Sequence, residues 1–309
     1  MTTAGAAAVP RGRRRISAET RWAFVFLLPW IIGFVIFTAG PMIVSLVLSF
    51  TDYNVIRPPE YTGLDNYALL ARDRRIPLAL GNTAFYALLH VPLLIIISLF
   101  LALMLLRVGR AAGLFRTAFY MPNMTPAVAV GTLFLLLLAG NGVINRGLAV
   151  IGIDGPNWLT DPTWVKPGIV LMSLWTLGST TVIYFAALRN VPLEIYEAAR
   201  IDGANAWQQF RSITLPFISG AIFFTLIVNT IASLQIFAEV YTMFFTTREA
   251  PAQESALFYT IYLFQKAFQD LDMGYASAMA WLLFLIILII TFIQIRLSDR
   301  FVFYAGDGR

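Results

Sequence analysis

The residues able to carry acid–base, nucleophilic or metal chemistry are few in this chain. It has one histidine, His90, and no cysteine among its 309 residues. Disulfides, thiolate metal sites and cysteine nucleophiles are therefore excluded, and a catalytic triad or a histidine metal cluster would depend on His90 alone. The sequence also has no Gly-x-x-x-x-Gly-Lys-Ser/Thr loop for nucleotide phosphates and no paired acid and base. We therefore do not expect an enzyme.

Polar side chains inside long apolar stretches form a second group with possible function, because such groups are costly in lipid and are usually paired or functional. Hydroxyls, amides and aromatic rings together would suit a polar, hydroxyl-bearing solute. The candidates for lining a solute path are Asn229, Ser233, Gln235, Glu239, Trp175, Ser179, Tyr275 and Trp281. Asn229 and Ser233 are four residues apart, which predicts that they share one face of a helix.

A purely structural role is the alternative for these polar residues. Ser, Thr and Asn often join membrane helices through hydrogen bonds, and we favour that interpretation for the serines and threonines. Glu239 could instead lie near the outer interface, where its charge costs little. His90, next to Pro92, is expected to be a packed, hydrogen-bonded residue rather than a proton relay.

Residues 190–216 form a polar segment between two apolar stretches, which we call the elbow. Pro192 suits the first turn of a helix, where its missing N–H is not needed. Gly203 can end that helix with a turn of positive φ. Asn205 and Gln208 have the spacing of a capping box at the start of a second short helix. The sequence therefore predicts helix, turn and helix at the membrane surface.

The second helix of the elbow carries aromatic side chains that are expected to be buried against a neighbouring apolar surface. Trp207, Phe210 and Thr214 fall on one side by their spacing of three to four residues. Two interpretations stay open at this point: the elbow packs on its own bundle or on lipid headgroups, or it docks against another protein.

The elements that position these residues are expected to be membrane helices. Hydrophobic residues make up 59% of the chain and charged residues 13%, against about 45–50% and about 25% in a typical soluble domain. A crossing needs about 20 apolar residues. The stretches expected to cross are about 22–50, 80–106, 117–140, 167–188, 216–245 and 273–296. The fold class is therefore an all-α membrane protein with six transmembrane helices, since backbone groups in lipid must be satisfied internally.

The apolar stretch 255–265 is too short to cross and is expected to be a short helix at the membrane interface.

Six spans place both termini on the same side of the membrane. With the N-terminus inside, 14 of the 22 Lys and Arg residues fall on the inner side, as expected for the cytoplasmic face. We therefore predict a cytoplasmic tail at 1–21, a transmembrane domain at 22–297 that includes the elbow on its cytoplasmic face, and a cytoplasmic tail at 298–309. The net charge of +5 then reflects topology, and we expect no nucleic acid partner.

The elbow also contains a pattern that resembles a known family. Glu-Ala-Ala is followed after three residues by Gly, and then after nine residues by Ile-x-Leu-Pro. The residues that carry the pattern are Glu197, Ala198, Ala199, Asp202, Gly203, Ile213, Leu215 and Pro216. This spacing is similar to the cytoplasmic loop of permease subunits of binding-protein-dependent ABC importers. The version with Asp202 and a downstream Phe210 resembles the sugar branch, which includes maltose-type and glycerol-phosphate-type permeases.

The resemblance implies a type I ABC importer permease fold in the inner (cytoplasmic) cell membrane. It implies as partners a second related permease subunit, an ATPase dimer, an extracytoplasmic solute-binding protein, membrane lipid and a sugar substrate. This chain would bind no cofactor, because ATP and Mg²⁺ belong to the ATPase. The elbow would be the coupling helix, with Glu197 facing a basic group of the ATPase, Gly203 forming the turn, and alternating access moving the sugar.

Two alternatives and one departure from the family pattern stay open. The solute could be glycerol phosphate or another polar molecule instead of a sugar. A secondary transporter is less favoured, because only Glu239 and His90 could couple ions within the membrane and no clear internal repeat is present. The family often continues the fifth span into a Gly-Gly-Pro turn, whereas residues 246–251 of this chain contain no glycine pair.

Overall fold

The structure is a computed structural model that describes residues 18–246 and 252–298. Most of this part is helical, as the apolar composition predicts. The strands in it are β1 (Thr51–Asp52) and β2 (Glu60–Tyr61), which form a short antiparallel ribbon in which Thr51 pairs with Tyr61. Both predicted tails, apart from the first residues of α1 and Ser298, lie outside the described residues, as does the departure at 247–251.

Four helical segments are long and apolar enough to cross a membrane: Trp22–Leu48, Arg75–Arg107, Ala206–Phe244 and Met273–Ser298. The first combines α1 (Ala18–Phe34), the π-helical turn η1 (Val35–Ala39) and α2 (Gly40–Leu48). The second is α4 and the fourth is α15. The third contains α11 (Ala206–Gln209), the π-helical η5 (Phe210–Thr214), α12 (Leu215–Leu234) and α13 (Ala238–Phe244).

Two further candidate spans are bent pairs of helices. One joins α5 (Ala112–Tyr120) and η3 (Met121–Met124) to α6 (Ala127–Leu137) with a bend of 99°. The other joins α8 (Pro162–Ser173) and η4 (Leu174–Thr176) to α9 (Gly178–Arg189) with a bend of 51°. The described residues thus contain four spans, or up to six if each bent pair counts as one. The first bend contains Pro122 and Pro126, which remove backbone donors and so interrupt the helix.

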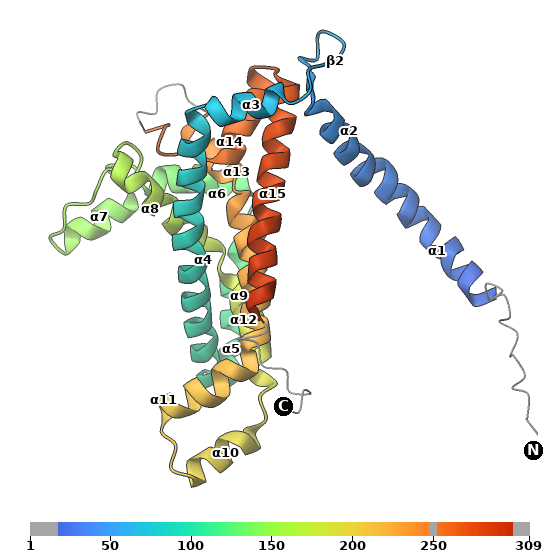
Figure 1. The fold of residues 1–309 in the computed structure, drawn as a ribbon. Coiled ribbons are helices and arrows are strands. Elements are labelled where there is room, and N and C mark those ends of the chain that lie inside the picture. Colours follow the sequence, from blue (N-terminus) through green and yellow to red (C-terminus); the bar gives the residue numbers. More distant parts are fainter. Residues whose placement is uncertain (1–17, 247–251, 299–309) are drawn as a thin grey trace, which may run out of the picture.

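The long helices form a bundle in which α4, α9 and α12 contact one another (Figure 1). The buried part of α4 divides between two apolar cores. Ile76 to Tyr86 belongs to a core at one end, together with α6, α13 and α15, and Leu99 to Leu105 belongs to a core at the other end, together with α9 and α12. His90 and Leu94 lie between these two cores along the same helix, so the middle of the bundle is packed differently from its ends.

The short elements at the first end of the bundle are α3 (Asp65–Arg72), α7 (Val143–Val150), α14 (Tyr259–Phe264) and the π-helical η6 (Gln265–Gln269). The stretch 255–265 was expected to be a short helix at the membrane interface and not a span; it contains the short helix α14, and its depth in the membrane stays a prediction. Phe258, Tyr259 and Ile261 are fully buried in the first core. Tyr259 also donates from its hydroxyl to the Met279 carbonyl at 2.9 Å, so the segment is held inside the bundle by tertiary contacts that its hydropathy could not reveal.

The first apolar segment stands away from the bundle (Figure 1). Of the side chains that the structure describes between 22 and 48, none is buried; Trp22 is 62% exposed and Phe37 is 80% exposed. Only its C-terminal part, α2, contacts α15 and β1. We call Trp22–Leu48 the arm. An apolar helix of this length needs lipid or another protein around it.

The elbow folds as the sequence predicts. Helix α10 (Leu193–Ile201) follows Pro192, and Gly203 has φ of +82°. Asn205 accepts from the Gln208 backbone N–H at 3.0 Å, and the Gln208 side chain accepts from the Asn205 N–H at 2.7 Å, which completes the capping box. The hydroxyls of Tyr196 on α10 and Thr214 on η5 lie 2.9 Å apart, and this hydrogen bond joins the two helical segments of the elbow.

A hydrogen-bonded cluster at the opposite end ties three elements together. The Asp73 carboxylate accepts from the hydroxyls of Tyr262 at 2.5 Å and Tyr275 at 2.7 Å, and from the Arg75 backbone N–H at 2.8 Å. Burial alone would raise the pKa of Asp73, but the hydrogen bonds from the two tyrosines and the Arg75 N–H, together with the positive charge of Lys266, lower the pKa below its ordinary value of 3.8. The charged form therefore stabilises the fold.

Replacing this carboxylate should lower stability in a pH-dependent way. We expect Asp73→Asn to reduce the free energy of unfolding by about 2 kcal/mol at neutral pH, because hydrogen bonds to a charged acceptor are lost. A depressed pKa contributes stability above the unfolded value and loses it as pH falls through the folded value. The difference in Tm between the variant and the wild type, measured in mild detergent, should stay constant from pH 8 to pH 5 and shrink below pH 3.8. Equal Tm values at pH 7 would contradict this role.

Candidate functional site

Three candidate spans are interrupted in the middle of the bundle. The first interruption is at Thr125, between η3 and α6, and the second is at Leu177, between η4 and α9. The third lies at Gln235–Phe237, between α12 and α13. Interrupted helices expose backbone groups that lipid cannot satisfy, so they are tolerated in membranes only inside protein or around a polar cavity.

A cavity of about 470 Å³ lies where these interruptions meet. Its walls come from the middle of α4, from η3, η4 and α9, and from the junction of α12 with α13. The polar residues that line it are Tyr86, His90, Asn123, Ser173, Thr176, Ser179, Asn229, Ser233, Gln235 and Glu239. Among its described lining residues there is no Lys or Arg, so the cavity offers neutral hydrogen-bonding groups and one carboxylate.

Five of the eight path candidates from the sequence line this cavity: Ser179, Asn229, Ser233, Gln235 and Glu239. The three aromatic candidates lie elsewhere. Trp175 packs edge-on against Phe134 with ring centroids 5.9 Å apart, and Trp281 packs against Phe284 at 5.2 Å. Tyr275 belongs to the Asp73 cluster. The functional roles of all eight stay predictions.

Tyr86, His90 and Asn123 line the cavity although the sequence did not indicate them as path residues. Tyr86 and His90 are four residues apart on α4, and their rings stack with centroids 5.1 Å apart. This i, i+4 pairing of a tyrosine and the single histidine inside an apolar stretch was the available signal. Asn123, between Pro122 and Pro126, was a second signal, because an amide can satisfy the backbone that prolines leave open.

A chain of hydrogen bonds connects α4 with α8 and α12 across the cavity wall. The Tyr86 hydroxyl donates to Ser173 Oγ at 2.8 Å, and His90 Nδ1 lies 3.0 Å from Ser233 Oγ. His90 is therefore packed and hydrogen-bonded, as expected. However, its Nε2 is buried without a partner in the described structure. A buried unpaired polar atom costs about 1–3 kcal/mol, so this nitrogen is a local cost of packing the histidine between α4 and α12.

Side chains also hold the interrupted backbones. In the amide orientation that suits its neighbours, Asn123 donates to the Thr176 carbonyl at 2.6 Å and accepts from the Ser179 N–H at 3.0 Å. The Thr260 hydroxyl donates to the Ile236 carbonyl within the third interruption. Gly178 permits the close approach of the first two interruptions, since a Cβ there would collide with the Phe119 carbonyl.

The other predicted group lies on the elbow, far from the cavity along α12. Glu197, Ala198, Asp202 and Gly203 are exposed, Ala199, Leu215 and Pro216 are half-buried, and Ile213 is buried in the second core. Large apolar side chains of the elbow are also exposed, including Ile201 at 86% and Trp207 at 67%. Ile213 and Leu215 pack the elbow against the bundle, whereas Asp202 and Gly203 in the outer turn are exposed.

Comparisons with known proteins agree on one family. Residues 74–303 match the family described as "binding-protein-dependent transport system inner membrane component". The chain is 38% identical to the probable ABC transporter permease protein YesP of Bacillus subtilis over 98% of both chains. It is 35% identical to the lactose transport system permease protein LacF of Rhizobium radiobacter, over 93% of this chain and 94% of that protein.

A solved structure has the same fold. A chain of the bacterial alginate ABC transporter, determined in complex with an alginate pentasaccharide-bound periplasmic protein, superimposes with a TM-score of 0.80. The two chains are 26% identical, and the match covers 91% of this chain and 95% of the other. The architecture of interrupted helices is therefore similar to that of a transporter component of known structure.

A methyl group at Gly178 should open the contact that holds the first two interruptions together. We expect Gly178→Ala to lower the free energy of unfolding by about 1–3 kcal/mol, because the added Cβ meets backbone rather than a movable side chain. Gly81→Ala on α4 is the matched control, since nothing lies within 4 Å of a Cβ added there, and alanine favours a helix. Thermal unfolding in detergent measures both variants; equal stability of the two would contradict a tight contact at Gly178.

Proposed function

Because the chain belongs to the family of binding-protein-dependent transport system inner membrane components, we propose that its central cavity forms part of the path of a sugar through the membrane. The chain is a permease subunit of an ABC importer and a multi-pass membrane protein, and subunits of this family are transport components rather than enzymes. The observation that carries the proposal is the meeting of three interrupted helices around one polar cavity. Broken helices at the middle of the bilayer are where transporters commonly bind solutes.

The chemistry of the cavity supports a sugar. Sugars present many hydroxyl groups, and the cavity supplies amides, hydroxyls and a carboxylate to bind them. Relatives are named for lactose, for starch degradation products and for arabinooligosaccharides. An anionic solute such as glycerol phosphate is less favoured, because the described lining holds Glu239 and no Lys or Arg to balance a phosphate charge.

The proposed topology has six spans, with each bent pair counted as one and both termini in the cytoplasm. The domain organisation is then a tail at 1–21, a membrane domain at 22–297 and a tail at 298–309. Arg107, Arg189 and Arg200 in the last turns of α4, α9 and α10 support this orientation, since basic residues favour the cytoplasmic side. The elbow would then face the cytoplasm.

The elbow is proposed to couple the membrane domain to a separate ATPase subunit, which binds ATP and Mg²⁺. Glu197, Ala198, Ala199, Asp202, Gly203, Ile213, Leu215 and Pro216 would form this coupling site. The exposed Glu197, Ile201 and Trp207 support it, because they offer one charge and two apolar groups for docking. From Ala206 the helical segment runs on to Phe244 and is interrupted only at Gln235–Phe237. A displacement of the elbow would therefore move α12 as a rigid body and shift the helix end that lines the cavity. Alternating access would follow from that motion.

The remaining proposed partners are a second, related permease subunit, a solute-binding protein outside the membrane, and lipid. The exposed arm supports the second permease, since an apolar helix without cover in its own chain needs a neighbour. A solved relative of the same fold was captured with a sugar-bound periplasmic protein, which supports a solute-binding partner. Half of the sugar path would then come from each permease.

Reversing one charge on the elbow should uncouple ATP from transport. We expect Glu197→Lys to lower ATP-driven uptake by at least tenfold in the reconstituted importer, because a misplaced charge at an interface costs several kcal/mol. Glu194→Lys is the matched control, since Glu194 is also exposed on α10 but lies outside the family pattern. The control should retain uptake, and both variants should insert normally. Unchanged uptake by Glu197→Lys would contradict the coupling role.

Removing one amide from the cavity should weaken transport without loss of assembly. Asn229 donates only to the Thr225 carbonyl of its own helix at 2.7 Å among the contacts described, so Asn229→Ala should fold normally. We expect a twofold to tenfold increase in KM for uptake, equivalent to one hydrogen bond of about 0.5–1.5 kcal/mol. Thr132→Ala is the matched control, since the Thr132 hydroxyl also donates to a carbonyl of its own helix, that of Val128 at 3.0 Å, and lies outside the cavity lining; it should leave KM unchanged. The same KM for wild type and Asn229→Ala would remove Asn229 from the path.

A further inference from the structure

A second large cavity, of about 890 Å³, lies between the elbow and the ends of α4 and α9. Three arginines line it: Arg107 from the last turn of α4, Arg189 from the last turn of α9 and Arg200 from the last turn of α10. Its described lining contains no Asp or Glu. Within residues 18–246 and 252–298 the ion pair present is Lys266–Asp270, at the far end of the bundle. The three arginines therefore line one space that has no carboxylate among its described lining residues.

Like charges that share a cavity repel one another, and an anion in that cavity would relieve the repulsion. Guanidinium groups are suited to phosphate, because their planar array of N–H donors can bind two oxygens at once.

The opposite wall of the same cavity is apolar. Leu103, Leu106, Leu188 and Leu193 line it, together with Trp207 and Phe210, whose rings lie 5.6 Å apart. The candidate spans that contain α4 and α9 end at Arg107 and Arg189, which places these two arginines where lipid headgroups would meet the hydrocarbon layer, with Arg200 of the elbow across the cavity from them. Basic pockets between membrane helices at that level are typical sites for anionic headgroups.

We propose that this cavity binds an anionic phospholipid of the adjacent leaflet, with the phosphate on Arg107, Arg189 and Arg200 and the start of an acyl chain against the leucines. The apolar wall favours a lipid over a soluble phosphate, which would leave the leucines in contact with water. A bound lipid would brace α10 of the elbow against α4 and α9. The inference requires that α4 and α9 span the membrane, but it does not depend on the sugar or on docking of an ATPase.

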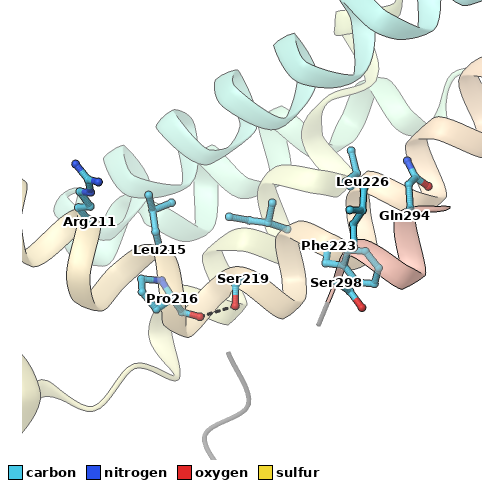
Figure 2. Close-up of a pocket in the computed structure, with 10 residues that line it drawn as sticks. Arg211, Leu215, Pro216, Ser219, Phe223, Leu226, Gln294 and Ser298 are labelled. Carbon is cyan, nitrogen blue, oxygen red and sulfur yellow. Dashed lines mark hydrogen bonds between the residues drawn. The ribbon is translucent and has the colours of Figure 1, made fainter. Parts of the chain in front are cut away.

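The elbow itself provides a matched control. Arg211 is an exposed arginine of η5, but it lines a separate, largely apolar groove between α12 and α15 (Figure 2). Leu215, Pro216 and Phe223 line that groove together with Arg211, and the described lining contains no second arginine. Arg211→Gln therefore removes one positive charge from the elbow without changing the lining of the proposed site.

The test is a lipid titration of the assembled importer, delipidated in mild detergent and followed by native mass spectrometry. We expect phosphatidylglycerol to bind saturably, and phosphatidylcholine and inorganic phosphate to bind at least tenfold more weakly. Each of Arg107→Gln, Arg189→Gln and Arg200→Gln should weaken phosphatidylglycerol binding about fivefold, as expected for one basic residue near an anionic lipid. Arg211→Gln should bind as the wild type does, and Arg189→Lys should retain most of the affinity because it keeps the charge.

Three results would overturn the proposal. Equal affinity for phosphatidylglycerol and phosphatidylcholine would show that charge is not recognised. Inorganic phosphate that binds as tightly as phosphatidylglycerol would replace the lipid by a soluble anion. An equal loss in Arg211→Gln and in the three site variants would indicate general attraction to a basic surface, with the three arginines serving only the carbonyl ends of their helices. Tm values measured on every variant separate loss of binding from loss of folding.

Discussion

The constraint on which this structure depends is that lipid cannot satisfy a backbone N–H or C=O group. Three candidate spans nevertheless break in the middle of the bundle. Each break is accepted because protein groups replace the lost helix bonds, as Asn123 does for the Thr176 carbonyl and the Ser179 N–H, and Thr260 does for the Ile236 carbonyl. The polar cavity is a consequence of these breaks, since the groups that compensate for them also line the space between the helices.

The same constraint connects the cavity to the elbow. Where the helix is continuous it is stiff, so the segment from Ala206 can transmit movement over the length of α12 as far as the break at Gln235. The two apolar cores hold the ends of the bundle, and the less densely packed middle is where helices can move against one another. A permease that opens alternately to the two sides of the membrane needs stiff helices that move as rigid bodies and a central region in which they can shift against one another.

Several apolar surfaces of the chain are exposed in the isolated subunit and need a neighbouring molecule to cover them. The arm exposes apolar side chains along its described length, and the elbow exposes Ile201 and Trp207. Their cost in water would be high, whereas lipid, a second subunit or an ATPase would cover them. The proposed lipid site adds a third kind of neighbour, at the level where arginines end the apolar spans.

The sequence by itself determined the helical membrane class, four of the apolar helices long enough to cross a membrane, and the local fold of the elbow. Apolar runs report the free energy of transfer into lipid, and Pro192, Gly203 and the Asn205–Gln208 pair specify turns through contacts of a few residues. Tertiary structure alone decided which side of each span faces the cavity. Every residue of a span lies in an apolar run, so hydropathy does not distinguish Tyr86 and His90, which line the cavity, from Trp281, which does not. The rotation of each helix is set by packing against its neighbours, and that information is not local in the chain.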